Sequence, residues 1–128
     1  MPAGPSELLV IADSSADPKY VISDLLSQAE HGEDSQVVLL AVDLSEQDIQ
    51  RYQEELVKQA TVLPRADIVK VSISKSYILC LKTIQEAIDF SNKYAPEHLI
   101  LNINNAESVV EQINNAGSIF VGPYSPER

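Results

Sequence analysis

Val37-Val38-Leu39-Leu40-Ala41-Val42 carries an apolar side chain at every position. A strand with one face in water alternates apolar and polar residues, whereas a strand covered on both faces reads as a continuous apolar run. Four further short apolar runs stand at 8–12, 77–81, 99–103 and 118–121, and most of them are also nearly continuous in apolar residues. The runs predict a sheet of about five strands with helices on both of its faces.

Longer segments of helical periodicity separate these runs, which is the pattern of βαβ units and a mostly parallel sheet. The expected helices run from Pro18 to Gly32, from residue 46 to Pro64, over 65–74, from Thr83 to Tyr94, and over 105–117. The first expected helix has Asp17 as its N-cap. Its apolar stripe consists of Val21, Ile22, Leu25, Leu26 and Ala29. At the start of the helix that ends at Tyr94, Thr83 and Glu86 form a capping pair. The fold class is therefore α/β, a three-layer Rossmann-like sheet. With no linker, repeat or low-complexity tract, we expect one domain over residues 1–128.

Charge and composition exclude some classes of partner. The chain has 128 residues, with 9 basic and 19 acidic side chains and a net charge of −10, which opposes binding to the phosphates of nucleic acid. No apolar run approaches the roughly 20 residues that cross a bilayer, and the N-terminus does not read as a signal peptide. Cys80 is the single cysteine and lies in an apolar run, so a buried, inert thiol in a cytoplasmic protein is expected.

The chain has two histidines, His31 and His98. A histidine near a helix end is often only a partner for the helix dipole. Asp24, Gln28 and His31 are spaced to share one helical stripe, roughly 120° from the apolar stripe. Imidazole is a common zinc ligand, but a glutamine amide is not, so this spacing alone is a weak metal signal.

Topology gives the histidines a shared location. In a parallel sheet, the C-terminus of each crossover helix lies at the edge where the next strand begins. That rule places Ser6, Gln28, His31, Glu97 and His98 at the amino edge. Ligands of such sheets usually bind at the carboxyl edge, so this site would be atypical, and another domain or chain would complete it.

The sequence has no G-x-G-x-x-G, no phosphate-binding loop and no nucleophile elbow. A flavodoxin-like receiver or nucleotide domain is an alternative, because Asp13 and Asp43 follow the first two strands. Aspartates in such places are also common helix caps. The alternation of strands and helices is Rossmann-like, but this segment has no dinucleotide-binding loop of its own.

Several motifs occur in order along the chain: MPAGPSE at 1–7, DLLSQAEHG at 24–32, PEHL at 96–99, AGSIFVG at 116–122 and SPE at 125–127. Together they closely resemble histidinol dehydrogenase. The resemblance implies an oxidoreductase of histidine biosynthesis. Such enzymes oxidise L-histidinol through L-histidinaldehyde to L-histidine, with two NAD⁺ and a bound Zn²⁺.

The resemblance also assigns roles residue by residue. Gln28 and His31 match zinc ligands that adjoin the substrate, and Ser6 matches a substrate contact. Glu97 and His98 match the acid/base pair. His98 would contact the substrate and take the alcohol proton, while Glu97 would activate the water that hydrates the aldehyde. Cofactor-binding residues are not expected here, because the family's NAD⁺ site belongs mainly to the portion preceding Met1.

The chain departs from the family near its end. The family's further zinc-binding Asp, in S-A-G-D, would follow SPE, but here Arg128 stands where a small residue is usual. Another metal ligand, a His, comes from the second subunit of a homodimer in the family. The resemblance thus implies an internal segment, an incomplete part of the enzyme's main domain, that is inactive alone. The alternative is a non-catalytic acidic α/β binding module that shares only ancestry, although such a module would be expected to lose Glu97 and His98.

Overall fold

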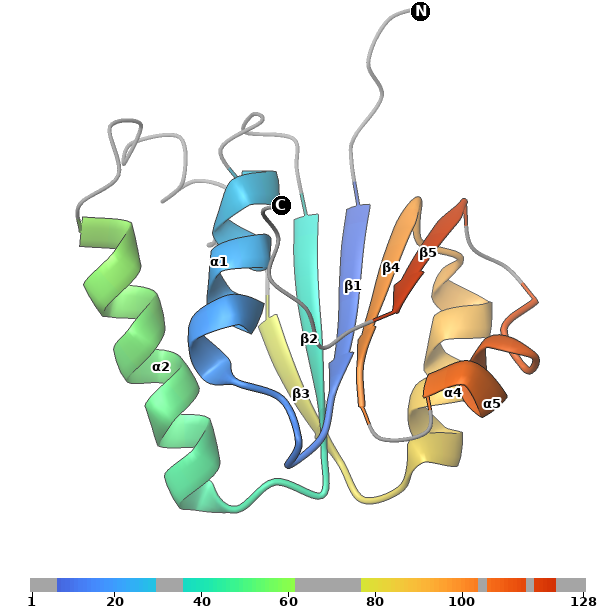
Figure 1. Ribbon diagram of the computed structural model, residues 1–128, viewed down its shortest axis with the longest axis horizontal. Helices are drawn as coiled ribbons and strands as arrows, with labels where there is room; N and C mark the ends of the chain where they lie inside the picture. The colour runs from blue at the N-terminus through green and yellow to red at the C-terminus, as the bar shows by residue number, and fades with distance from the viewer. Residues whose placement is uncertain (1–6, 30–35, 62–76, 104–105, 115–116, 122–128) are drawn as a thin grey trace, which may run out of the picture.

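The computed structural model describes residues 7–29, 36–61, 77–103, 106–114 and 117–121 (Figure 1). Its elements, in chain order, are β1 (Glu7–Ala12), α1 (Pro18–Ala29), β2 (Gln36–Val42), α2 (Glu46–Thr61), β3 (Tyr77–Leu81), α4 (Ile84–Tyr94), β4 (His98–Asn102), α5 (Ala106–Val110) and β5 (Ser118–Val121).

The strands form one parallel sheet in the order β3-β2-β1-β4-β5. The chain therefore runs outward from the central strand β1 through β2 to β3, and then crosses to the other side of β1 for β4 and β5. Figure 1 shows α1 and α2 on one face of the sheet and α4 and α5 on the other. The predicted fold class, a parallel sheet between two helical layers, is confirmed.

Two apolar clusters fill the spaces between the sheet and the helices. The cluster under α1 and α2 contains Leu8, Val10, Ala12, Val21, Ile22, Leu25, Leu26, Val37, Leu39, Tyr52 and Ile100. The cluster under α4 and α5 contains Leu9, Ile11, Val38, Leu40, Val42, Ala87, Ile88, Leu99, Leu101, Ile103, Ala106 and Val109. Alternate residues of β1 and β2 belong to opposite clusters, which explains why these strands are apolar at successive positions.

The predicted helix starts are confirmed by their capping bonds. Asp17 Oδ1 accepts a hydrogen bond from the Lys19 N–H at 3.0 Å, at the start of α1. Before α4, Thr83 Oγ1 accepts from the Glu86 N–H at 3.2 Å, and Glu86 Oε1 accepts from the Thr83 N–H at 3.2 Å. Each bond satisfies a backbone donor that the first helical turn leaves without a partner.

The second helix starts as expected, directly after Ser45. Ser45 Oγ accepts from the Asp48 N–H at 3.2 Å, and Asp48 Oδ2 accepts from the Ser45 N–H. Arg51 Nη2 donates to Asp48 Oδ1 at 2.6 Å. The bond to Arg51, followed by those to Ser45, lowers the pKa of Asp48 below its usual value. The expected helix over 65–74, the stop at Pro64 and the end of the first helix beyond Ala29 lie outside the described residues.

The helix predicted over 105–117 is wrong in its length, because α5 covers only Ala106–Val110. At the end of α5 the hydrogen bonds join residues three apart instead of four: the Gln112 N–H donates to Val109 O, and the Ile113 N–H donates to Val110 O. The Asn114 N–H next donates to Asn92 Oδ1, on α4, at 2.7 Å. A side chain distant in sequence thus supplies the partner that a continued helix would have offered.

The prediction of a buried thiol at Cys80 is also wrong, because this residue is exposed. Strand order is the physical reason: β3 lies at an edge of the sheet and pairs only with β2 among the described strands. An apolar run cannot reveal from the sequence alone whether its strand is central or at an edge.

Tyr52 offers a test of the packing beneath α2. Its side chain is buried, and among the described residues its hydroxyl has no hydrogen-bond partner. A buried hydroxyl without a partner costs about 1–3 kcal/mol. We therefore expect Tyr52→Phe to leave the free energy of unfolding unchanged or to raise it by about 1 kcal/mol, as measured by urea denaturation.

The same residue makes a pH prediction. Burial, followed by the charges of Asp48, Asp17 and Asp13, raises the pKa of the Tyr52 phenol above its ordinary value of 10. Since the folded pKa is the higher one, this group's contribution is fully present below pH ~10 and is lost as the pH rises further. The Phe variant should therefore lose less stability above that pH. A loss of stability at neutral pH on substitution would show that the hydroxyl has a partner.

Candidate functional site

The turn between α4 and β4 places Glu97 and His98 at the amino edge of the sheet. After Tyr94, Ala95 adopts the left-handed conformation, with φ 52° and ψ 58°, and its N–H donates to Ser91 O at 2.8 Å. Pro96 follows and cannot continue the helix. The chain thus reverses within a few residues, so that His98 becomes the first residue of β4, one position earlier than the sequence predicted.

The side chains of Glu97 and His98, both predicted site residues, lie near each other without forming a hydrogen bond. His98 Nε2 lies 3.9 Å from Glu97 Oε1, which is longer than a hydrogen bond and within reach of an ion pair when the imidazole is protonated. The His98 side chain is 38% exposed and that of Glu97 is 57% exposed. Both groups can therefore meet a molecule from outside.

The strand register decides which face His98 occupies. His98 lies opposite Leu8 of β1 and Ser118 of β5, on the same face as Ile100 and Phe120. This is the face on which α1 and α2 pack, but Phe120 remains 44% exposed. The described helices therefore cover β1 and β2 more completely than the β4–β5 part of this face.

Phe120 is a neighbour of His98 that the sequence did not single out. Its ring centroid lies 6.3 Å from that of the imidazole, with the ring planes tilted by 36°. An apolar ring beside a partly exposed histidine provides a surface for an aromatic or aliphatic part of a ligand. Only the pairing of β4 with β5 places Phe120 beside His98, and the sequence of neither strand shows that pairing.

Of the other predicted site residues, only Gln28 lies in a described element. It belongs to the last turn of α1, which ends at the edge of the sheet where the strands begin (Figure 1). The Gln28 side chain, together with Ser6 and His31, lies outside what the structure describes. The structure thus brings Glu97 and His98 together and places the end of α1 at the same edge.

The described residues do not by themselves fit a zinc ion. Among them, no group of three or more His, Cys, Asp or Glu side chains gathers to hold a metal. Glu97 and His98 are two donors, whereas zinc in proteins normally takes three or four protein ligands. We therefore derive no catalytic step through a metal from these residues.

The turn between β1 and α1 does not fit a dinucleotide. In Rossmann folds the pyrophosphate binds at this helix N-terminus. Here Asp17 caps the helix with its carboxylate, and Asp13 Oδ1 accepts from both the N–H and the hydroxyl of Ser15. Two carboxylates at this position repel a pyrophosphate. The turn is held by its own side chains, and we derive no step through NAD⁺ here.

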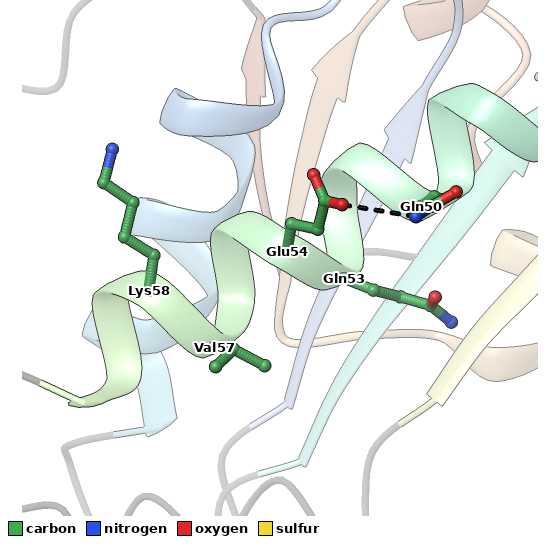
Figure 2. A pocket seen from close by; sticks show the side chains of 5 residues that line it. All are labelled: Gln50, Gln53, Glu54, Val57 and Lys58. Carbon is green, nitrogen blue, oxygen red and sulfur yellow. Dashed lines mark hydrogen bonds between the residues drawn. The ribbon is translucent and has the colours of Figure 1, made fainter.

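A shallow depression on α2 also contains none of the predicted site residues (Figure 2). Its described lining comes from one helix: Gln50, Gln53, Glu54, Val57 and Lys58. Gln50 Nε2 donates to Glu54 Oε2 at 3.2 Å, as Figure 2 shows. These five side chains lie on the outer, exposed face of α2, and Val57 is the one apolar residue among them. None of the described helices is long and apolar enough to cross a membrane.

Comparisons with known proteins agree with the motifs. A family model for histidinol dehydrogenase matches residues 1–128. The histidine biosynthesis trifunctional protein of Neurospora crassa is 58% identical over 127 residues, covering 99% of this chain and 15% of that protein. The chloroplastic histidinol dehydrogenase of Arabidopsis thaliana is 54% identical over 127 residues, covering 99% of this chain and 27% of that protein.

A solved structure gives the same result. The crystal structure of histidinol dehydrogenase from Elizabethkingia anophelis superimposes with a TM-score of 0.91 at 50% identity, over 98% of this chain and 28% of that one. The chain spans about 15 to 28% of the length of these three proteins. Because the family model matches every residue, the chain belongs to the histidinol dehydrogenase family.

Proposed function

We propose that this chain is part of an enzyme that oxidises L-histidinol through L-histidinaldehyde to L-histidine, using NAD⁺ and Zn²⁺. The observation that carries the proposal is the Glu97–His98 pair, exposed at the amino edge within a family match that spans residues 1–128. A non-catalytic relative would be expected to have lost Glu97 and His98, and both are present in this chain.

His98 is the proposed base for the alcohol. Its neutral imidazole accepts the hydroxyl proton as the substrate is oxidised, and its partly exposed ring gives the substrate access. Glu97 is the proposed base that activates the water attacking the aldehyde. Since the two side chains come within 3.9 Å, both can serve the same substrate carbon in successive steps.

Three further residues are proposed to surround the substrate. Ser6, Gln28 and His31 contact it, and His98 binds it as well. Gln28 and His31 provide two ligands for Zn²⁺, whose chemistry when bound is to polarise the substrate oxygen. NAD⁺ would accept the hydride, and we assign no cofactor-binding residue to this chain.

The proposal extends to partners and location. We expect a single α/β domain over residues 1–128, in a homodimer whose second subunit completes the metal site, working in the cytoplasm. The plant relative is named as chloroplastic, so the compartment can differ between members of the family. The net charge of −10 supports neither a nucleic-acid partner nor attraction to an anionic membrane surface.

Residues 1–128 alone are expected to be inactive, because two proposed ligands cannot complete a zinc site and no cofactor site is assigned here. The purified polypeptide, shown to be folded by circular dichroism, should produce no NADH from L-histidinol, NAD⁺ and Zn²⁺. The complete enzyme, assayed at the same concentration, is the control. NADH formation by the short polypeptide would contradict the expectation that other parts of the enzyme are required.

A further inference from the structure

Gly117 lies where the chain enters β5, directly beside the backbone of the proposed acid/base pair. A Cβ atom placed on Gly117 would lie 2.5 Å from the carbonyl oxygen of Glu97 and 3.3 Å from its carbonyl carbon. A carbon atom does not approach an oxygen this closely without a shift of one of them. We propose that Gly117 is a positioning residue, whose missing side chain lets the Glu97–His98 peptide take its required orientation.

The need for glycine here is one of space. Gly117 does not adopt the left-handed backbone conformation that disfavours other residues. An alanine would therefore meet no penalty from a left-handed φ at this position. What an alanine cannot do is share the space occupied by the Glu97 carbonyl group.

The crowded atoms belong to the peptide unit that joins the two proposed bases. The carbonyl carbon and oxygen of Glu97 lie in one plane with the nitrogen and Cα of His98. A push on this oxygen therefore rotates the whole unit and redirects the side chains at both of its ends. The relation between imidazole and carboxylate, 3.9 Å apart here, would change with it.

The surrounding contacts leave little freedom to relieve the clash. The Gly117 N–H donates to Pro96 O at 3.0 Å, so Gly117 cannot retreat without losing this bond. On the other side, β4 is held by β1, with His98 opposite Leu8. The clash must therefore be absorbed at the Glu97–His98 peptide or by breaking the strand pairing between β4 and β5.

Asn92 of α4 binds the backbone of the segment that follows α5. Its Nδ2 donates to Gln112 O at 3.1 Å, and its Oδ1 accepts from the Asn114 N–H at 2.7 Å. These two bonds hold Gln112 and Asn114 against α4, the helix that also leads to Glu97 and His98.

The test is Gly117→Ala in the complete enzyme, and it rests on the proposed function. Misplacement of catalytic groups by about 1 Å can cost on the order of 100-fold in rate. We expect kcat to fall by roughly 10- to 100-fold, while KM stays within about twofold because the substrate-binding residues elsewhere are untouched. Glu111→Ala, at an exposed position in the same connection, is the matched control and should retain wild-type kinetics.

A double-mutant cycle separates positioning from general damage. If Gly117 acts through the acid/base pair, Gly117→Ala should add less than about twofold to the loss caused by His98→Gln. Concentrated enzyme and long incubations keep the residual rates measurable. An undiminished loss in the His98→Gln background, or wild-type kcat for Gly117→Ala, would overturn the proposal.

Two further results complete the test. If His98→Gln itself leaves kcat unchanged, the base role proposed for His98 is wrong, and the positioning role of Gly117, which rests on it, is overturned as well. If Gly117→Ala does not fold, Asn92→Ala replaces it: a lower kcat that vanishes in the His98→Gln background supports positioning. A folded Asn92→Ala variant with wild-type kcat, beside a Gly117→Ala that cannot fold, would assign Gly117 to stability and overturn the proposal.

Discussion

His98→Gln in the complete enzyme is expected to lower kcat for histidinol oxidation by about 10²- to 10⁴-fold, the usual contribution of a positioned general base. The glutamine amide is polar and fills part of the same space, but it cannot accept the alcohol proton near neutral pH. The rate of NADH formation at saturating histidinol measures the effect. The change should fall mainly on kcat, because the partly exposed ring contributes only some of the substrate contacts.

A companion substitution distinguishes the two proposed roles. Glu97→Gln should slow oxidation of added histidinaldehyde far more than the first oxidation of histidinol, since only the aldehyde step needs an activated water. Glu107→Gln, which removes an exposed carboxylate from α5, serves as the control. Wild-type rates for both His98→Gln and Glu97→Gln would contradict the acid/base roles proposed for this pair.

Leu9→Ala is expected to destabilise the protein by about 2–5 kcal/mol, the usual range for a large-to-small change in a close-packed core. Leu9 is fully buried in the central strand, paired with Val38 of β2 and Leu99 of β4. The cavity cannot close easily, because strands on both sides and the helical layer above fix its walls. Since whole domains are stable by only about 5–15 kcal/mol, this is a large share of the total.

The measurement for Leu9→Ala is the midpoint of urea unfolding, followed by circular dichroism. Val57→Ala is the matched control, because Val57 is 66% exposed on the outer face of α2 and should cost less than about 0.5 kcal/mol. Equal effects of the two substitutions would contradict the two-layer core described above.

Local sequence signals predicted the elements well where a few neighbouring residues decide the structure. The Thr83–Glu86 capping pair and the cap at Asp17 are examples, since each bond joins residues close in the chain. The continuous apolar run at 37–42 predicted burial on both faces for the same reason. These features depend on the backbone and its immediate neighbours, which the sequence states directly.

Features that depend on distant contacts could not be predicted in this way. The length of α5 depends on Asn92, more than a dozen residues earlier, and the exposure of Cys80 depends on the place of β3 in the sheet. Motifs indicated Glu97 and His98 as a pair but gave neither their separation nor the face of the sheet. The role proposed for Gly117 likewise depends on a backbone 20 residues away.

The strand order has a consequence for how the protein reaches its working state. The strands β1, β2 and β3 pair with neighbours along the chain, whereas the pairing of β1 with β4 joins Leu8 to His98 across most of the sequence. Closing so long a loop costs entropy before any contact repays it, so distant pairings form slowly. His98 meets Glu97 and Phe120 within the second half of the chain, but its place beside Leu8 forms only when the two halves of the sheet meet. The amino edge that carries the proposed site is therefore a product of the whole sheet and of no local segment alone.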